Sequence, residues 1–413
     1  MLNTENNDMT LSQKAIRSVR NGQMAFCKFL SANDTGLTGG HQCGIYIPKC
    51  ARHLIFDQDG ERGSNMKRLA KIRWQGDYVT ESKFIYYGTG TRNEYRITRF
   101  GRDFDLLKPK NTGALVVLVR NSEEDYDGWV LEYEDDINDF LNTFGMSPTD
   151  TGDLIHMDGK FMPEDLDVLA LQKMDIFIQG LKGGFPCAKE MSATARQIYN
   201  DVYDHIENII QKPDKELLAW NHMEYDLFRR IEEVQYGSQI RAGFSTMQDF
   251  IDTANSILNR RKSRAGKSLE FHLSAIFDGN NLVYESQVVT EEKKRPDFVF
   301  PSGAAYHDPK YPVDRLIVLG AKTTCKDRWR QVITEADRTD IKYLCTLQQG
   351  ISPQQLHEMS TEKVVLVVPK PYIKCYPKEY QESIMTLGTF IQFVREKTGA
   401  CYKPNNNLGM VAE

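Results

Sequence analysis

The first part of the chain is built from short apolar runs separated by polar residues. These runs lie at residues 44–47, 83–87, 114–120 and 129–132, and glycine, asparagine and aspartate divide them. Short strands bounded by turn-forming residues are typical of β-barrels and β-sandwiches. We therefore predict a mostly β domain over residues 25–178, preceded by a loosely held polar extension at residues 1–24.

The pattern changes after the sequence GLKGGFP at residues 180–186, which we place in a linker at residues 179–188. Beyond it, segments with helical spacing of apolar residues alternate with short apolar runs. The predicted helices span residues 193–210, 216–235, 247–259, 327–337 and 377–398, and a further predicted helix carries Glu270. The predicted strands span residues 281–289, 297–300, 317–322, 343–347 and 364–368. This order predicts an α/β sandwich over residues 189–413.

The amino-acid composition indicates the cellular compartment and limits the classes of binding partner. The 413 residues carry a formal net charge of −5, so nucleic-acid binding would depend on local basic clusters. The eight cysteines show no Cys-x-x-Cys spacing, which predicts reduced thiols in a cytoplasmic protein without a zinc site or disulfides. No apolar run is long enough for a membrane span, and we expect no membrane partner.

A basic run at residues 260–267 places five cations in eight positions. Arg261 and Lys262 in this run are candidates for DNA phosphate contacts, although a solvated cationic face is the usual explanation for such a run. The sequence AGKS at residues 265–268 lacks the first glycine of a P-loop, because that position is Arg261. We therefore predict no nucleotide cofactor.

An acid and a lysine are predicted at one edge of the second sheet. Asp297 opens one strand and Lys322, 25 positions later, ends another. Nucleases of the PD-(D/E)XK kind need a second carboxylate two residues before this lysine, but that residue is Gly320. Glu335, on the following helix, is the candidate replacement as a Mg²⁺ ligand beside Asp297, and Glu270 could supply a third carboxylate. Surface ion pairs between these groups are the alternative explanation.

The β domain contains two further candidate segments. A glycine-rich loop at residues 31–42 leads into a strand, and its backbone amides could approach phosphate. Alternation at residues 91–102 places two arginines and a glutamate on one strand face, which suits guanine and cytosine edges in a major groove. A salt-bridged edge strand is the alternative. The candidates here are His41, Tyr46, Arg92, Glu94 and Arg96.

Several long motifs stand out in both domains. They are NRRKSRAGKSLE at residues 259–270, PD at 296–297, AAYHD at 304–308 and KTTCKDRWRQ at 322–331, with SANDTG at 31–36 and TRNE at 91–94. Together these motifs resemble those of the EcoRII restriction endonuclease family. The resemblance runs from about residue 25 to about residue 395. It implies a DNA-binding pseudobarrel as an effector domain and a catalytic domain with the PD-(D/E)XK fold.

The resemblance also implies a function. It predicts a homodimeric, Mg²⁺-dependent enzyme that cuts double-stranded DNA at 5′-CCWGG and binds a second copy of this site through the effector domain, relieving an obstruction of its own catalytic cleft. Asp297, Lys322 and Glu335 carry over as the reaction centre, with Glu270 as an accessory acid. Lys326, Asp327 and Arg328 would read G·C pairs, although Asp327 could instead be a helix N-cap.

The family flips the central base pair of its site out of the duplex. Trp220 and Tyr225 lie in the segment where this pocket is expected, although a buried core tryptophan is an equally good explanation. A non-catalytic DNA-binding regulator with the same two folds is the alternative function. A third reading makes Tyr306 a covalent nucleophile, as in tyrosine recombinases.

Overall fold

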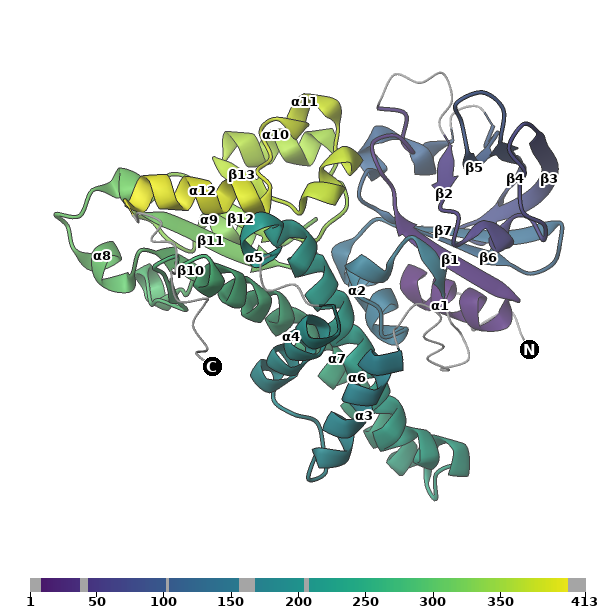
Figure 1. Ribbon diagram of the computed structural model, residues 1–413. Coiled ribbons are helices and arrows are strands. Elements are labelled where there is room, and N and C mark those ends of the chain that lie inside the picture. The colour runs from purple at the N-terminus through teal and green to yellow at the C-terminus, as the bar shows by residue number, and fades with distance from the viewer. Residues whose placement is uncertain (1–8, 38–43, 102–103, 156–167, 204–207, 400–413) are drawn as a thin grey trace, which may run out of the picture.

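The computed structural model describes residues 9–37, 44–101, 104–155, 168–203 and 208–399. Two sheets lie side by side with helices between and below them (Figure 1). The two-domain fold class predicted from the sequence is confirmed. No helix among the described residues is both long and apolar enough to cross a membrane.

The first sheet has eight strands that curl around one core. They are β1 Met24–Phe29, β2 Ile45–Ile47, β3 Asn65–Trp74, β4 Tyr78–Tyr87, β5 Glu94–Thr98, β6 Leu115–Arg120, β7 Asp125–Leu131 and β8 Asp153–Ile155. Their order is β2-β5-β4-β3-β7-β6-β1-β8. Apolar side chains of β1 to β7, including Phe26, Trp74 and Phe84, meet inside the curl. This closure around one interior is the predicted pseudobarrel.

Two helices cover the outside of β1 and β6. They are α1 Leu11–Asn21 and α2 Glu134–Thr143. Ala15 and Val19 of α1 and Phe140 of α2 are buried against Leu115 and Val117. Residues 11–21 are therefore a packed amphipathic helix and not part of a loose extension, because their apolar positions recur at helical spacing despite the polar composition.

The second sheet has five strands in the order β13-β12-β11-β10-β9. They are β9 Glu285–Ser286, β10 Phe298–Phe300, β11 Ile317–Lys322, β12 Lys342–Thr346 and β13 Val364–Val367. β11, β12 and β13 are parallel, whereas β10 is antiparallel to β11. Such a sheet is buried on both faces by helices.

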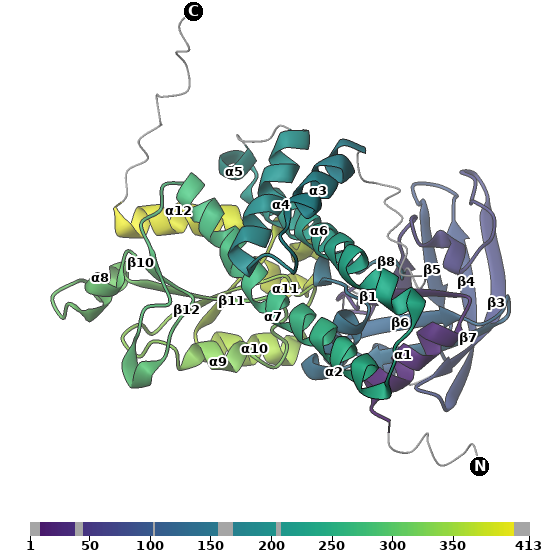
Figure 2. The ribbon, with the colours of Figure 1, turned by 90° about the horizontal axis from the view of Figure 1, so that it is seen from below.

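Helices form a layer on each face of this sheet (Figure 2). On one face lie α6 Pro213–Ala242, α7 Met247–Gly279 and α12 Leu387–Thr398, and on the other lie α9 Trp329–Ile333 and α10 Pro353–Thr361. The remaining α-helices are α3 Val168–Gly180, α4 Ala188–Tyr203, α5 Asn208–Gln211, α8 Gly303–His307 and α11 Lys378–Gln381. The predicted α/β sandwich is present.

Several predicted elements differ in extent; the helix predicted at residues 377–398, for example, is divided into α11 and α12. Residues 247–279 form one continuous helix, because the basic run after residue 259 consists largely of good helix formers and contains no proline. The strand predicted at residues 281–289 is reduced to β9, and the helix predicted at residues 327–337 is only α9. The linker at residues 179–188 stays a prediction; α3, which precedes it, packs its Ala170 and Met174 against α4 and α6.

The two domains touch closely along several segments. Gly113 of the first domain has φ +83°, and a Cβ there would lie 2.1 Å from the carbonyl oxygen of Gly350. Glycine is therefore required for this approach. The Ala32 amide donates to the Cys375 carbonyl at 2.8 Å, and Gln348 Nε2 donates to the Gly113 carbonyl at 3.0 Å.

A charged cluster lies at the same interface. His222 Nδ1 of α6 lies 2.9 Å from Asp150 Oδ1 of the first domain, and His222 Nε2 lies 3.5 Å from Asp226 Oδ2. Arg229 pairs with Asp226 at 2.7 Å. The hydrogen bond with Asp150, with help from Asp226, raises the pKa of His222 to about 9, although burial and Arg229 oppose this.

This cluster predicts a pH-dependent contribution to stability. The pKa of His222 is higher in the folded protein than its ordinary 6.5, so protonation favours the folded, closed interface. The contribution of protonated His222 to the free energy of unfolding is complete below pH about 6.5 and is lost as the pH rises through about 9. The difference in thermal midpoint between the wild type and His222→Asn should be largest at pH 6 and vanish near pH 10. A difference that stays constant over this range would contradict the assignment.

Candidate catalytic centre

Asp297 and Lys322 lie together at one end of the second sheet. Asp297 immediately precedes β10, and Phe298 pairs with Leu319, so Asp297 lies beside the C-terminal end of β11. Asp297 Oδ2 accepts a hydrogen bond from the Ala321 amide at 2.7 Å and lies 3.4 Å from Lys322 Nζ. The antiparallel pairing therefore brings the acid and the lysine to the same edge.

Glu335 occupies the space that the missing side chain at position 320 would enter. A Cβ at Gly320 would lie 3.5 Å from Glu335 Oε2 and 2.8 Å from Val332 Cγ2. Glu335 Oε1 lies 4.0 Å from Lys322 Nζ. The structure thus brings Asp297, Lys322 and Glu335 together and places a carboxylate where the strand itself offers none.

Glu335 is held in an environment that disfavours its charge. Burial raises its pKa to about 7; the charges of Asp297 and Glu270 add to this effect, whereas Lys322 opposes it. Glu335 Oε2 is buried and has no hydrogen-bond partner among the described residues. A buried carboxylate oxygen without a partner is costly unless a proton or a cation accompanies it.

Glu270 lies on α7 at the border of this centre. Its carboxylate is 3.0 Å from Lys267 Nζ, and burial together with the charge of Asp297 raises its pKa. Gln287 connects the two acids, because its Nε2 donates to Glu270 Oε2 at 3.2 Å and to Asp297 Oδ1 at 3.1 Å. No pattern in the sequence pointed to Gln287, since its role depends on contacts across 10 and 17 residues.

The carboxylates fit a divalent cation that keeps part of its water shell. Among the described residues, no three histidine, cysteine, aspartate or glutamate side chains converge as a complete metal site. Mg²⁺ is commonly held by one or two carboxylates, with waters and substrate phosphates completing the shell. Asp297 and Glu335 supply such a pair, and the unpartnered oxygen of Glu335 offers a free ligand atom.

The predicted reading residues Lys326, Asp327 and Arg328 lie in the loop between β11 and α9. They precede the helix, whose N-cap is Arg328, so Asp327 is not the N-cap of α9. Asp327 Oδ2 instead accepts from the backbone amide of Glu134, the first residue of α2, at 2.9 Å. Lys326 is buried, and its burial lowers its pKa to about 8.

The side chain of Glu134, in the first domain, also binds this loop. Its carboxylate accepts from the amides of Asp327 and Arg328 at 2.8 and 3.0 Å and from Arg328 Nε at 2.6 Å. The Thr324 hydroxyl donates to it at 2.8 Å. Although burial opposes ionisation, the Asp327 amide and the Arg328 guanidinium hold the pKa of Glu134 below its usual value. A carboxylate from one domain therefore occupies the donors of the predicted reading loop.

Arg261 makes the corresponding contact at the other end of α2. Its Nη1 donates to the carbonyls of Asn142 and Thr143 at 3.0 and 2.7 Å, and its Nη2 pairs with Glu232 at 2.7 Å. Lys262, the next residue, is exposed. Both ends of α2 are thus held by side chains that the sequence predicted to contact DNA.

The predicted face of the effector domain lies on β2 and β5. Glu94 and Arg96 share one face of β5 and pair at 3.2 Å, and Arg96 lies opposite Tyr46 of β2. Arg92 precedes β5 and lies over the Tyr87 ring at 5.2 Å. β5 lies between β2 and β4, so it is not an edge strand. His41 lies outside the described residues.

The three remaining candidates are buried. Trp220 packs in the sheet core and donates to Asn200 Oδ1 at 3.2 Å, and the Tyr225 ring is covered by the Arg264 guanidinium at 3.5 Å from its centroid. The Tyr306 hydroxyl donates to Glu291 Oε2 at 2.7 Å, and the Arg338 amide donates to that hydroxyl at 3.2 Å. These hydrogen bonds engage the Tyr306 hydroxyl, which would have to be free to act as a covalent nucleophile.

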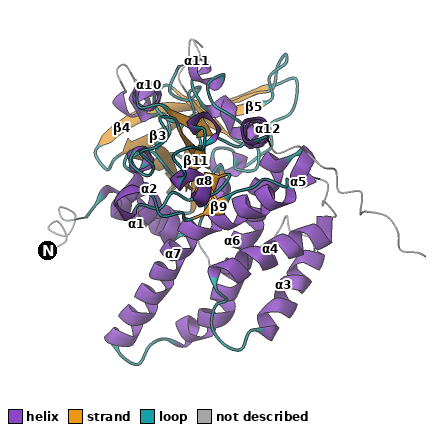
Figure 3. Cartoon of the chain, turned by 90° about the vertical axis from the view of Figure 1, so that its left-hand side faces the viewer, coloured by secondary structure: helices purple, strands orange, loops and turns teal. Residues whose placement is uncertain are grey.

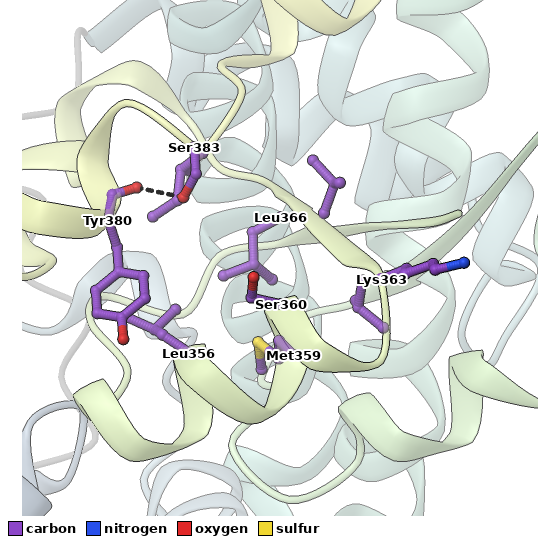
Figure 4. Close-up of a pocket in the computed structure, with 10 residues that line it drawn as sticks. Leu356, Met359, Ser360, Lys363, Leu366, Tyr380 and Ser383 are labelled. Carbon is purple, nitrogen blue, oxygen red and sulfur yellow. Dashed lines mark hydrogen bonds between the residues drawn. The ribbon is translucent and has the colours of Figure 1, made fainter. Parts of the chain in front are cut away.

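A separate pocket lies between α10, β13 and α11 (Figure 4). Its volume is about 120 Å³, and it contains none of the predicted site residues. The one ionisable cation among its lining residues, Lys363, is paired with Asp340 at 3.3 Å. The lining residues are Leu356, Met359, Ser360, Lys363, Val364, Val365, Leu366, Tyr380, Ser383 and Ile384. Ser360, Lys363 and Ser383 are exposed, so this pocket opens to the surface.

Comparison with known proteins gives matches to both domains. A family model described as EcoRII C terminal matches residues 228–391, and one described as restriction endonuclease EcoRII, N-terminal, matches residues 19–149. The chain is 38% identical over 389 residues to the type II restriction enzyme EcoRII of Escherichia coli, which covers 89% of this chain and 92% of that protein.

Two more distant similarities were found. The type II restriction enzyme SsoII of Shigella sonnei is 30% identical over 126 residues, covering 28% of this chain and 40% of the relative. A solved complex of metal-depleted Ecl18kI with uncleaved, modified DNA is 18% identical, with a TM-score of 0.44, covering 57% of this chain and 88% of that one.

Proposed function

Since this chain belongs to the EcoRII family of type II restriction enzymes, and is therefore a site-specific deoxyribonuclease, we propose that it cuts duplex DNA at 5′-CCWGG. Asp297, Lys322 and Glu335 would form its reaction centre. The observation that carries this assignment is the position of the Glu335 carboxylate in the space left by Gly320, beside the other two groups. The enzyme would act in the cytoplasm of a bacterium.

Each residue of this centre has a distinct part in phosphodiester hydrolysis. Asp297 and Glu335 would hold Mg²⁺, which, when bound, supplies the Lewis acid that polarises the scissile phosphate. Lys322 Nζ lies within 4.0 Å of both carboxylates and can orient or deprotonate a water beside them. Glu270, with its raised pKa, borders the centre as an accessory acid. The expected products carry 5′-phosphate and 3′-hydroxyl ends.

Removing any of the three central groups should abolish most of the cleavage. Asp297→Asn, Lys322→Met and Glu335→Gln should each lower the single-turnover rate on a CCWGG duplex by about 10²-fold or more at saturating Mg²⁺. Binding of the same duplex without metal should persist. A wild-type protein that binds the duplex but never cuts it with Mg²⁺ present would instead favour the regulator on the same fold.

The contacts of α2 support an autoinhibited enzyme. Asp327, Arg328 and Arg261 cannot contact a duplex while Glu134 and the carbonyls of α2 occupy them. A second CCWGG site bound at the face formed by Tyr46, Glu94 and Arg96 would favour the state in which the domains separate. Binding energy at the effector site would thereby release the reading loop.

Glu134 offers a direct test of this obstruction. Glu134→Ala removes an acceptor of four donors, so it should raise cleavage of a one-site substrate roughly tenfold or more. Two-site substrates should gain much less, because the second site already releases the loop. Asp135→Ala is the matched control, since Asp135 is the adjacent exposed acid of α2. Equal one-site rates in the wild type and Glu134→Ala would refute the role of this contact.

The hairpin of α6 and α7 is the surface that we propose for a homodimer. It extends away from both sheets (Figure 3). Its far end exposes Val234, Ile240, Met247, Phe250 and Ile251, with exposed fractions from 40% to 73%. Exposed apolar clusters of this kind mark interaction surfaces. A near-palindromic site that is cut on both strands requires two catalytic centres related by a twofold axis, and a second copy of the chain supplies the other.

A charge at this surface should separate the copies. Phe250→Asp combined with Met247→Asp should shift the sedimentation of the wild-type dimer to that of a monomer at micromolar concentration, because two buried charges would be unpaired. Val313→Asp, at an apolar residue of similar exposure elsewhere, should leave the dimer intact. A double variant that remains dimeric would exclude this hairpin as the interface.

A further inference from the structure

Glu335 is carried by an irregular segment and not by a helix. α9 ends at Ile333, and the backbone at Glu335 is a bend. Its own element holds it by one bond, from the Glu335 amide to the Val332 carbonyl at 3.2 Å. A metal ligand must nevertheless be fixed closely, so another part of the chain has to fix this backbone.

Thr290 supplies the first external contact. It is 6% exposed, and its hydroxyl donates to the Glu335 carbonyl at 2.6 Å. The alternative acceptor, the Lys294 carbonyl, is farther away at 3.2 Å. Since a hydroxyl has a single proton, the shorter bond to Glu335 is the preferred one. A side chain 45 residues away thus holds the peptide unit of the proposed metal ligand.

Residues next to Thr290 and Glu335 form further hydrogen bonds between the same two segments. Glu291 Oε2 accepts from the Tyr306 hydroxyl at 2.7 Å and from the Asp337 amide at 3.2 Å. The Tyr306 hydroxyl in turn accepts from the Arg338 amide at 3.2 Å. The Arg338 guanidinium donates to the carbonyls of Ala305, Tyr306 and Tyr311. Residues 335–338 are therefore tied to the loop before β10 and to α8.

The same loop also reaches the other acid. Gln287 begins it, with a left-handed φ of 55° that a non-glycine residue adopts only when its surroundings impose it. Its side chain donates to Asp297 Oδ1 and Glu270 Oε2. One segment, residues 287–291, thus contacts Asp297 at its start and the backbone of Glu335 near its end.

We propose that residues 287–291 form a brace that sets the distance between Asp297 and Glu335, with Thr290 as the positioning residue for Glu335. The inference rests on the proposed role of Glu335 as a metal ligand. In enzymes whose second carboxylate lies on the strand, the sheet itself fixes the pair. Here the Glu335 carboxylate is on a loop, and the brace holds it in place of the sheet. Groups that orient metal ligands typically change metal affinity or activity 10- to 100-fold when removed.

The proposal is tested by a pair of substitutions at Thr290. Thr290→Val keeps the shape but removes the hydroxyl, so the Mg²⁺ concentration for half-maximal cleavage should rise about 10- to 100-fold. Thr290→Ser keeps the hydroxyl and should restore the wild-type value. Thr334→Val is the matched control, because Thr334 precedes Glu335 but its hydroxyl donates to the Gln331 carbonyl of α9 and not to the Glu335 backbone.

A second measurement does not depend on cleavage. Binding of Mg²⁺ to the folded protein raises its thermal midpoint, so the midpoint measured against Mg²⁺ at constant ionic strength reports metal affinity. In Thr290→Val this rise should move to about 10-fold higher Mg²⁺ or more. Binding of a CCWGG duplex without metal should remain that of the wild type. A midpoint lowered equally at all Mg²⁺ concentrations, with unchanged metal dependence, would indicate a merely structural role and overturn the brace.

Glu335→Gln separates this proposal from the one on which it rests. If Glu335→Gln leaves the Mg²⁺ dependence unchanged, Glu335 is not a ligand and the proposed centre is wrong. If Glu335→Gln abolishes the Mg²⁺ response while Thr290→Val behaves as the wild type, the centre stands and the brace is refuted.

Discussion

The absence of a side chain at Gly320 is the constraint on which the catalytic centre depends. A Cβ at this position would lie 2.8 Å from Val332, so α9 could not pack against β11 as it does. That packing places the segment after α9 over the end of the strand, where the Glu335 carboxylate enters the vacant space. The loss of a carboxylate from the strand and the gain of one from the loop are therefore one structural event, because the small residue is what admits the Glu335 side chain.

As a result, part of this centre is held in place by the surrounding loops and not by the sheet. Asp297 directly precedes β10 and Lys322 ends β11, so the sheet positions both, whereas the backbone of Glu335 is held by the Thr290 side chain and that of Asp337 by Glu291. The reading loop that begins after Lys322 has the same character. Its free amides are satisfied by Glu134 of the other domain and not by its own helix. The positions of Glu335 and of the loop after Lys322 therefore both depend on contacts with neighbouring segments.

The sequence predicted those parts of the centre that depend on strand spacing. Asp297 and Lys322 were placed correctly in space because two strands of predictable length carry them, and Gly320 marked the broken motif. Gln287, Thr290 and Glu134 could not be found in this way. Their contacts span 10, 45 and 193 residues, and no local pattern encodes such pairings. α9 was predicted too long because its amphipathic pattern continues through residue 336, whereas the helix ends at Ile333 and the following residues bond to Thr290 and Glu291.

The contacts of Glu134 also determine the energy of the opening that we propose. Taking the buried Glu134 carboxylate out of water costs several kcal/mol, which its bonds to the loop amides and to the half-exposed Arg328 guanidinium roughly offset. In the proposed open state, the same amides and guanidinium would meet phosphate or base acceptors, and Glu134 would return to water. Opening would therefore exchange one set of acceptors for another and leave no donor buried without a partner. Because the two states would satisfy the same donors, a few kcal/mol of binding at a distant site would be sufficient to change which state prevails.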